Sequence, residues 1–189
     1  ACACPNRLTR RTLERIFETL PCQLTLIDVP NRVRDLSDPV DADVERLKIS
    51  VGEQGADVGV LIDDDSQRCG FIDEQGELVA NETITGCLAE LVLAEHPGAK
   101  VAVETPALRM LRPIVDQFGG TMIAAGSTMA EMTHAMRGEN TLIGGGRSGR
   151  IWFRESRPTS DAILTLAHVL ALLSRSDAPL SAVVQGASI

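Results

Sequence analysis

Hydrophobic residues along this chain form two kinds of pattern: short continuous runs, and stretches in which they recur every three or four positions. Short apolar runs bounded by turn residues predict β-strands, whereas the longer spacing predicts amphipathic helices. The runs that predict strands occupy residues 1–4, 23–28, 57–62, 69–73, 100–104, 121–125, 141–143 and 151–154. The helical spacing occupies residues 83–94, 107–118, 128–136 and 161–174, and two further helices are predicted nearer the N-terminus.

Polar residues mark where several of these helices begin, because Ser, Thr, Asp and Asn side chains accept hydrogen bonds from the first free backbone N–H groups. Thr9 is suited to cap a helix that carries Leu13, and either Asp41 or Asp43 is suited to cap the next one. Asp161 precedes the last long helix and is interpreted as its cap.

Strands that alternate with helices are typical of the α/β class, in which helices cover a mostly parallel or mixed sheet. The turn-rich segment 96–99 interrupts the pattern, and a new series of strands and helices follows it. The sequence therefore predicts two consecutive α/β domains, residues 1–96 and residues 97–189, each a mixed sheet covered by helices. Because Ala1 already lies in a predicted strand, we expect a piece of a longer protein, and the polar tail after Asp177 is interpreted as a linker remnant.

Composition and charge exclude several classes of function. Hydrophobic residues make up 44% of the 189 positions and charged residues 23%, as in ordinary globular proteins. A net charge of −8 disfavours non-specific nucleic-acid binding, which requires a basic face. No apolar run approaches the roughly 20 residues that span a bilayer, so no membrane partner is expected. The five cysteines fit no disulfide or zinc pattern and favour a reduced, cytoplasmic chain, with Cys2 and Cys4 as small buried thiols rather than metal ligands.

The predicted strand 57–62 is followed by three consecutive aspartates, Asp63, Asp64 and Asp65. Like charges this close repel each other, and a divalent cation such as Mg²⁺, which prefers carboxylate oxygens, would relieve the repulsion. Side chains alternate along an extended segment, so Asp63, Asp65 and Gln67 are expected to face one point. The alternative is an exposed turn between strands whose charges are solvated. The triplet by itself is compatible with both interpretations.

The residues around this triplet resemble a known family. Segment 62–76 resembles the stretch of the α-D-phosphohexomutases that reads DGDGDR, continues as a short strand and ends in a D-E-x-G turn. Segments 55–59, 96–100 and 117–120 resemble a strand entry, a turn and a helix end of the same family, in the same order. Over essentially its whole length, the chain is similar to the second and third of that family's four domains.

This resemblance implies a metal site and a catalytic residue. In the family, which includes phosphomannomutase and phosphoglucomutase, a serine in the first domain carries a phosphate and the aspartates hold Mg²⁺ against it. By position, Asp63 and Asp65 would be metal ligands, and Gln67 would replace the third aspartate. Because an amide oxygen brings no charge, Gln67 is expected to weaken Mg²⁺ binding. Arg68 matches the arginine near the transferring phosphate and is the candidate catalytic residue; the alternative is a surface ion pair with Asp64 or Asp65.

A second candidate site is the glycine-rich segment 144–150, which joins two predicted strands. Glycines permit positive φ angles and a close approach of backbone to a ligand, although a plain hairpin turn has the same composition. By position the segment resembles the family's sugar-specificity loop, G-E-x-S-G-H. Ser148 is retained, whereas Gly146 replaces the glutamate and Arg150 replaces the histidine. The candidate substrate-binding residues are therefore Ser148, Gly146, Arg147 and Arg150. The two arginines are compatible with an anionic ligand and equally with solvation.

Two functions are compatible with these observations. The first is a fragment of a phosphomannomutase- or phosphoglucomutase-like isomerase of carbohydrate metabolism, which transfers a phosphoryl group within a hexose phosphate and uses Mg²⁺. Its partners would be the hexose phosphate and the family's first and fourth domains, without which this piece is expected to be inactive. The alternative is a divergent, non-catalytic relative that binds an anion or a sugar phosphate. The replacements at Gln67, Gly146, Arg150 and Ala130 favour this alternative. A further option is a purely structural α/β unit whose loops have no function.

Overall fold

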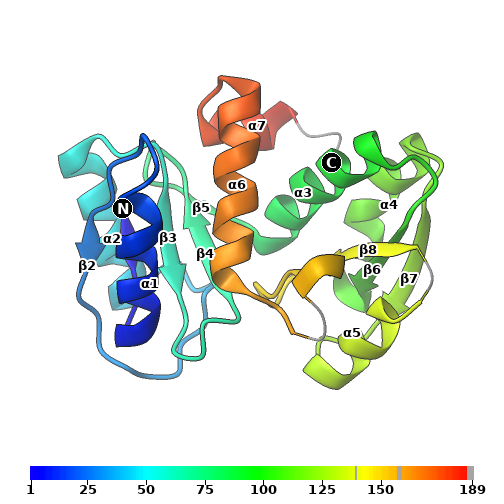
Figure 1. Cartoon of the computed structure of the whole chain (residues 1–189), viewed down its shortest axis with the longest axis horizontal. Helices are drawn as coiled ribbons and strands as arrows, with labels where there is room; N and C mark the ends of the chain where they lie inside the picture. Colours follow the sequence, from blue (N-terminus) through cyan, green and yellow to red (C-terminus); the bar gives the residue numbers. More distant parts are fainter. Residues whose placement is uncertain (139, 157–158, 187–189) are drawn as a thin grey trace.

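The computed structural model describes residues 1–138, 140–156 and 159–186. Two β-sheets lie side by side in it, and a long helix, α6 (Ala162–Ser176), stands between them (Figure 1). Each sheet combines parallel and antiparallel strands, and helices cover both. The predicted fold class, α/β with two mixed sheets covered by helices, is therefore confirmed.

Within the described residues, the first sheet has five strands. They lie side by side in the order β2 (Leu26–Ile27), β1 (Cys2–Ala3), β3 (Gly59–Ile62), β4 (Cys69–Ile72) and β5 (Leu78–Val79). β1 runs parallel to β2 and β3, whereas β4 and β5 extend the sheet in antiparallel fashion. The helices of this half are α1 (Arg7–Phe17), α2 (Ala42–Gln54) and α3 (Asn81–Glu95).

The second sheet repeats the order of the first. Over the part of the chain that the structure describes, its four strands lie in the order β7 (Thr121–Ala125), β6 (Lys100–Glu104), β8 (Thr141–Gly145) and β9 (Trp152–Phe153). β6 runs parallel to β7 and β8, and β9 is antiparallel to β8. Besides α6, the helical segments of this half are η1 (Thr105–Ala107), α4 (Leu108–Gln117), α5 (Met129–Met136), η2 (Arg154–Ser156) and α7 (Leu180–Gly186). β6 therefore occupies the place that β1 has in the first sheet.

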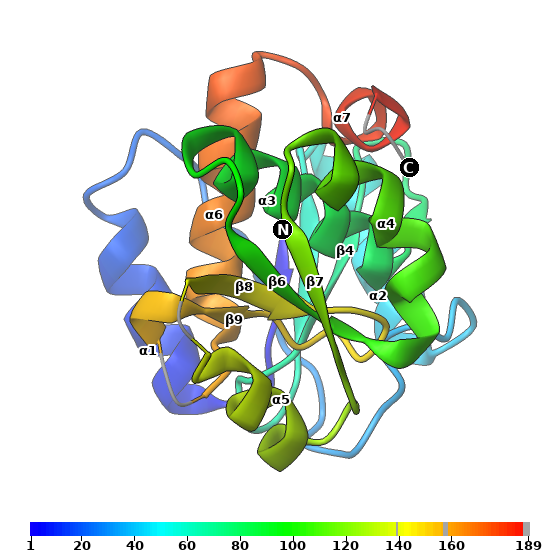
Figure 2. The same ribbon diagram turned by 90° about the vertical axis from the view of Figure 1, so that its right-hand side faces the viewer.

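The last long helix of each half lies against the sheet of the other half. α3 follows the first sheet in sequence but packs against β8 and α4. α6 follows the second sheet but packs against β4 as well as α3. Figures 1 and 2 show that α3 and α4 cover one face of the second sheet and α5 covers the opposite face. The predicted division at residue 96 stays a prediction, because α3 belongs to one half by sequence and contacts the other by packing.

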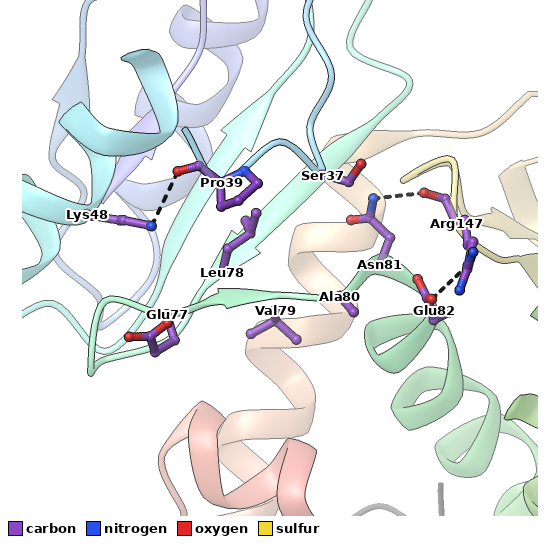
Figure 3. Close-up of a pocket in the computed structure, with 10 residues that line it drawn as sticks. All are labelled: Ser37, Pro39, Lys48, Glu77, Leu78, Val79, Ala80, Asn81, Glu82 and Arg147. Atoms are coloured by element: carbon purple, nitrogen blue, oxygen red, sulfur yellow. Dashed lines mark hydrogen bonds and ion pairs between the residues drawn. The ribbon is translucent and has the colours of Figure 1, made fainter. Parts of the chain in front are cut away.

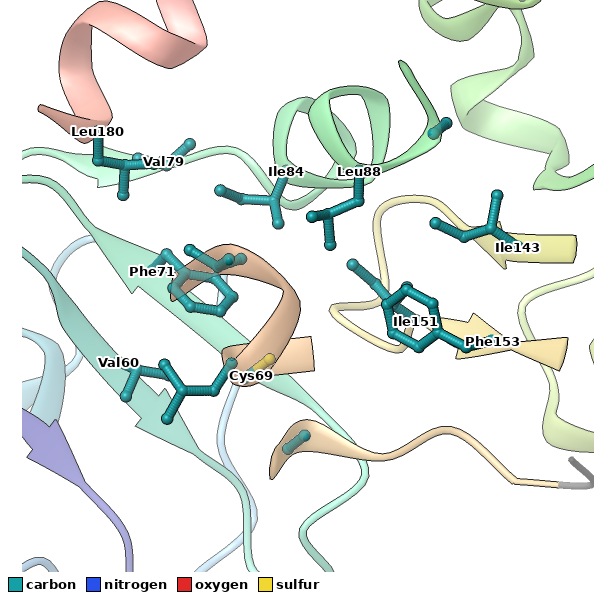
Figure 4. Packing of buried hydrophobic residues seen from close by; sticks show 14 of the residues in the cluster. Val60, Cys69, Phe71, Val79, Ile84, Leu88, Ile143, Ile151, Phe153 and Leu180 are labelled. Carbon is teal, nitrogen blue, oxygen red and sulfur yellow. The ribbon is translucent and has the colours of Figure 1, made fainter. Parts of the chain in front are cut away.

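A hydrophobic core runs through the junction of the two halves. Buried side chains from β4, α3, β8 and β9 belong to one continuous cluster, which includes Phe71, Leu88, Ile143 and Phe153 (Figure 4). Burying a side chain of this kind contributes about 1.5–3 kcal/mol relative to leaving it exposed. Each half is therefore stabilised by contact with the other.

The helix starts agree with the predictions except at α1. Its cap is Asn6, not Thr9, because the Asn6 side-chain oxygen accepts the N–H groups of Leu8 at 2.9 Å and Thr9 at 3.2 Å. A cap must precede the first turn, and Thr9 lies inside that turn. Asp41 caps α2 and Asp161 caps α6, as predicted.

Other predicted boundaries are wrong. The strand predicted at 23–28 comprises only β2, and β5 was not predicted. The tail after Asp177 is no linker remnant, since residues Leu180–Gly186 form α7 and bury Leu180 and Ser181. The turn between β4 and β5 holds this helix, because the Glu74 carboxylate accepts the N–H of Ser181 at 3.2 Å.

No single helix within the described ranges is long and apolar enough to cross a membrane. Taken together, α6 and α7 satisfy the same test by length and composition, but they are bent by 85° relative to each other.

Candidate functional site

Residues 63–68 form the acid loop, which connects β3 to β4. The loop begins at the carboxyl end of β3, beside β1, where consecutive connections leave the sheet in opposite directions. In open α/β sheets ligands bind outside this edge, at the point where the strand order reverses. The acidic triplet therefore lies where the topology of the sheet favours a binding site.

Asp63 holds the acid loop in its turn. Its side chain is 1% exposed, and its Oδ1 accepts the backbone N–H groups of Gln67 at 2.9 Å and Arg68 at 3.0 Å. Its Oδ2 accepts the Nε–H of Arg68 at 2.6 Å. The alternative predicted for Arg68, an ion pair with Asp64 or Asp65, is wrong in its partner, because the pair forms with the buried Asp63. Charge-assisted bonds of this kind are stronger than neutral ones, so Asp63 and Arg68 fix each other.

The three aspartates of the acid loop converge. One carboxylate oxygen from each of Asp63, Asp64 and Asp65 lies within 4.8 Å of the others. Burial, followed by the hydrogen bond and the negative charge of Asp63, raises the pKa of Asp65 above its ordinary value. A cation bound between these oxygens would relieve that repulsion. Asp64 was not among the predicted ligands, yet it lies in the same group.

Gln67 carries a further oxygen acceptor in the acid loop. Its backbone N–H donates to Asp63 and Asp65, whereas its side-chain Oε1 is buried and has no hydrogen-bond partner among the described residues. An unpaired buried acceptor costs free energy, which coordination to a cation would recover. The converging carboxylates of the acid loop therefore suit a hard divalent cation such as Mg²⁺, and the unpaired amide oxygen of Gln67 is of the same ligand type but brings no charge.

Residues 146–150 form the glycine loop, which connects β8 to β9 at the equivalent place in the second sheet. A buried carboxylate, that of Glu104 at the end of β6, lies inside this loop and is 1% exposed. Its Oε2 accepts the N–H groups of Arg147 at 2.7 Å and Ser148 at 3.0 Å, and its Oε1 accepts the Ser148 hydroxyl. Sequence reasoning missed Glu104, although a carboxylate that ends a buried apolar strand is the same signal that marked Asp63.

The two loops meet through their backbones. Arg68 and Arg150 form an antiparallel β-bridge, and the N–H of Cys69 donates to the carbonyl oxygen of Gly149 at 3.1 Å. The charge of Arg150 acts on Asp65, whose pKa it lowers against the larger raising effect of burial. The Nε of Arg150 is itself buried without a hydrogen-bond partner in the described part of the chain. The structure thus joins the predicted metal ligands and part of the glycine loop in one region.

Each loop also contacts the start of the helix that crosses over from the other half. The carbonyl oxygen of Ser66 accepts the N–H of Ala162 at 3.0 Å, at the start of α6. The side-chain amide of Asn81, at the start of α3, donates to the carbonyl oxygen of Arg147 at 3.0 Å. The crossed helices therefore hold the two loops against each other.

Arg147 lies apart from the acid loop. It pairs with Glu82 at 2.9 Å and lines a pocket of about 410 Å³ together with Asn81, Lys48 and Ser37 (Figure 3). Its side chain is 63% exposed. Of the candidate substrate-binding residues, Arg150 therefore lies nearer the acidic group, and Arg147 faces a separate hollow.

Comparison with protein families identifies the second half of the chain. Residues 81–188 match the family described as "Phosphoglucomutase/phosphomannomutase, alpha/beta/alpha domain III". The chain belongs to the phosphoglucomutase/phosphomannomutase family.

Curated relatives in this family carry related names. A phosphomannomutase/phosphoglucomutase of Pseudomonas putida is 26% identical over 181 residues, which cover 92% of this chain and 39% of the relative. A phosphohexose mutase of Xanthomonas campestris is 31% identical over 136 residues, covering 72% of this chain and 30% of the relative. The chain thus spans about two fifths or less of the relatives that it matches.

Solved structures of the phosphoglucomutase/phosphomannomutase family share the fold. A family protein from Burkholderia thailandensis superposes with a TM-score of 0.87 at 23% identity, covering 100% of this chain and 42% of that one. An N-acetylphosphoglucosamine mutase from Aspergillus fumigatus, solved in complex with GlcNAc-6P and magnesium, has a TM-score of 0.63 at 17% identity. It covers 97% of this chain and 44% of that one. Both likenesses extend over both sheets.

Proposed function

We propose that this chain is the part of a phosphohexomutase that holds a divalent cation and one face of a hexose phosphate during intramolecular phosphotransfer. The observation that carries the proposal is the bridge between Arg68 and Arg150, with the bond from Cys69 to Gly149 beside it. This contact between the acid loop and the glycine loop supports a single site to which both contribute. Membership of the phosphoglucomutase/phosphomannomutase family supports the reaction type.

In this proposal the acid loop binds Mg²⁺ through Asp63, Asp65 and Gln67. The cation, when bound, neutralises charge on the phosphoryl group in transfer. Arg68 acts beside it: its Nε is held by Asp63, which leaves its terminal nitrogens for a phosphate oxygen. Because Gln67 brings no charge, we expect Mg²⁺ affinity below that of a site with three aspartates.

The glycine loop is proposed to bind the hexose phosphate. Gly146, Arg147, Ser148 and Arg150 remain the candidate residues, and Arg150, which bridges to the acid loop, suits the anionic end of the ligand. The chain spans a minor part of its relatives' length, so the activity belongs to the whole protein. We expect the chain by itself to be inactive and to depend on the family's first and fourth domains. The cytoplasm, suggested by the reduced cysteines, is the expected location.

Calorimetric titration tests the cation site. The chain is titrated with MgCl₂, then with glucose 1-phosphate and mannose 1-phosphate, each with and without saturating Mg²⁺. We expect saturable Mg²⁺ binding that weakens by about tenfold or more in Asp65→Ala, because a ligand charge is lost. Asp116→Ala is the matched control, since Asp116 is an exposed aspartate on α4. Absence of Mg²⁺ binding, or equal loss in both variants, would rule the cation site out.

A second function, binding of a sugar phosphate or other anion without catalysis, is favoured by one observation. The hydroxyl of Ser148 is bonded to Glu104 and also accepts the N–H of Arg150 at 3.2 Å. Because this hydroxyl is bonded within the protein, it is not available to orient a sugar hydroxyl for phosphotransfer. Phosphotransfer by the full-length parent with glucose 1-phosphate and Mg²⁺ separates the two functions. Turnover supports the mutase, and hexose phosphate binding without turnover supports the binding protein.

A further inference from the structure

Glu104 is a buried carboxylate, and the hydrogen bonds that it accepts from the described residues come from the glycine loop. It is 1% exposed and accepts two backbone N–H groups and one hydroxyl, from Arg147 and Ser148. No ion pair to it is found among the described residues, so its charge is stabilised by these donors. Successive backbone N–H groups that point at one spot form a binding site for an anion. In this loop the anion belongs to the protein itself.

Gly146 is matched to this arrangement. A Cβ atom at residue 146 would lie 2.5 Å from the Cβ and 2.8 Å from the Oε2 of Glu104. Distances this short are not compatible with two side chains, so a side chain at residue 146 and the side chain of Glu104 exclude each other. A glutamate at residue 146 therefore has no room beside Glu104 on β6.

We infer that Glu104 is a positioning residue that sets which groups of the glycine loop face the ligand. Its carboxylate turns Ser148 inward, because the hydroxyl and the N–H of that serine both bond to it. Arg150, bridged to Arg68, is left beside the acid loop. The inference rests on the proposed function only where it concerns the ligand; the structural role of Glu104 is tested without one.

Trp152 is a natural reporter of this loop. It is the single tryptophan of the sequence, follows the loop in β9 and is 0% exposed. It packs in a small cluster with Ala102 of β6, two residues before Glu104. A loosened glycine loop is expected to let water reach the indole and shift its fluorescence to longer wavelength.

The first experiment removes the Glu104 carboxylate and supplies acetate in solution to take its place. Glu104→Ala removes two carbons and two oxygens, which acetate supplies. We expect the variant to melt at a lower temperature and to emit at longer wavelength. Acetate, balanced with chloride at constant ionic strength, should reverse both changes in a saturable way and raise the Tm by about 3 °C or more. The wild type should not respond.

Glu74→Ala is the matched control, because the Glu74 carboxylate also accepts an N–H and a hydroxyl, both from Ser181. It lies in the turn before β5, away from Trp152, so acetate should leave its emission unchanged. An acetate response in Glu74→Ala equal to that in Glu104→Ala would overturn the inference, as would no response in Glu104→Ala.

A milder variant covers the case in which Glu104→Ala does not fold. Glu104→Gln keeps the shape but has one acceptor oxygen in place of two, so the three donors cannot all be satisfied. We expect a lower Tm, a red-shifted Trp152 emission and no acetate response, since the space is filled. Emission and Tm equal to those of the wild type would show that the carboxylate is not needed.

The second experiment moves the carboxylate to the loop. Gly146→Glu should be strongly destabilised, because the new side chain meets Glu104. The double variant Gly146→Glu with Glu104→Gly should recover much of that loss, since glycine at residue 104 removes the Cβ as well as the carboxylate. A double variant less stable than either single one would contradict the mutual exclusion.

Binding of glucose 1-phosphate to Glu104→Gln tests whether Glu104 affects the ligand. If the wild type binds the sugar phosphate, we expect the variant to lose about tenfold or more in affinity, and Glu74→Ala to lose none. Equal affinity in Glu104→Gln and wild type would overturn the effect on the ligand face. If the wild type does not bind, the proposed function fails while the acetate result still decides the role of Glu104.

Discussion

The acid loop and the glycine loop are each held by a buried carboxylate, but the carboxylate comes from a different part of the chain in each. Both leave the third strand of sheets with the same strand order, and both point backbone N–H groups at a buried carboxylate. In the acid loop this carboxylate is the loop's own first residue, Asp63, which accepts the N–H groups of Gln67 and Arg68. In the glycine loop it is Glu104, which comes from the neighbouring strand β6.

The difference sets the charge that each loop presents. The acid loop turns around Asp63 and keeps two further carboxylates, Asp64 and Asp65, in the same group, which favours a cation. The glycine loop contains no carboxylate, because its anion is supplied from β6, and its charged residues are Arg147 and Arg150. One backbone arrangement thus serves a negative site in one sheet and a positive site in the other.

The largest expected effect on stability comes from removing the Asp63 carboxylate, around which the acid loop turns. Asp63→Ala leaves the partly buried Arg68 guanidinium and two loop N–H groups without their acceptor. Breaking a buried ion pair in this way costs about 3–5 kcal/mol in the free energy of unfolding, measured by urea denaturation. Asp64→Ala is the control, expected within about 0.5 kcal/mol of the wild type. A loss below about 1 kcal/mol in Asp63→Ala would show that Asp63 does not hold the loop.

The next effect concerns the contact between the loops. Gly149→Ala places a Cβ 3.1 Å from the carbonyl oxygen of Cys69 at a φ of +76°. We expect a loss of about 2–4 kcal/mol, from backbone strain and from the contact together. Gly76→Ala separates the two causes, because Gly76 has a φ of +86° with nothing within 4 Å, so only the strain of about 1–2 kcal/mol remains. Equal losses in thermal denaturation would mean that the loops are not in close contact.

Each loop contains a serine whose hydroxyl is hydrogen-bonded within the protein, and the stability cost of removing these two hydroxyls can be compared. Ser148→Ala leaves an oxygen of the buried Glu104 with one donor fewer and is expected to cost about 1–2 kcal/mol. Ser66→Ala removes the bond between the Ser66 and Thr9 hydroxyls, at 2.6 Å, which joins two neutral groups and should therefore cost less than about 1 kcal/mol. Urea denaturation of both variants under one condition tests the order. A larger loss in Ser66→Ala than in Ser148→Ala would argue that the bond to Glu104 is not the stronger of the two.

The smallest effect is a gain in stability that depends on pH. The pKa of Asp65 is raised in the folded chain, first by partial desolvation and then by Asp63, so folding disfavours its ionised form. Asp65→Asn should therefore raise the Tm at neutral pH. The gain in the free energy of unfolding should be less than about 1 kcal/mol, because the residue is exposed to solvent. The gain should vanish as the pH falls below the ordinary aspartate pKa, where both states are protonated. A gain that persists at low pH would have another cause.

Much of the fold could be predicted from the sequence because buried positions are hydrophobic and recur with the period of the strand or helix that carries them. The apolar runs at 100–104 and 121–125 give β6 and β7 with the observed bounds, and Asp41 and Asp161 cap helices as predicted. The exchange of α3 and α6 between the sheets was not predictable. Hydrophobic spacing shows that one face of a helix is buried, but it does not show which sheet covers that face.

The local geometry of the acid loop was predicted in part for the same reason. Asp63, Asp65 and Gln67 were selected by local spacing, and the structure places them on one turn. Glu104 was missed because its partners, Arg147 and Ser148, lie more than forty positions further along the chain. Pairing between distant segments depends on strand order, here β6 beside β8, which spacing alone does not reveal.

The crossing of α6 onto the first sheet has a consequence for how the chain is made. During synthesis β4 emerges long before α6, with which it packs in the finished structure. At about 5–20 residues per second, the ribosome needs roughly 5 to 20 seconds to add the intervening segment. Throughout that interval this part of the first sheet lacks its partner and presents apolar surface to its surroundings. The nascent protein should therefore be most prone to aggregate before its last long helix is released.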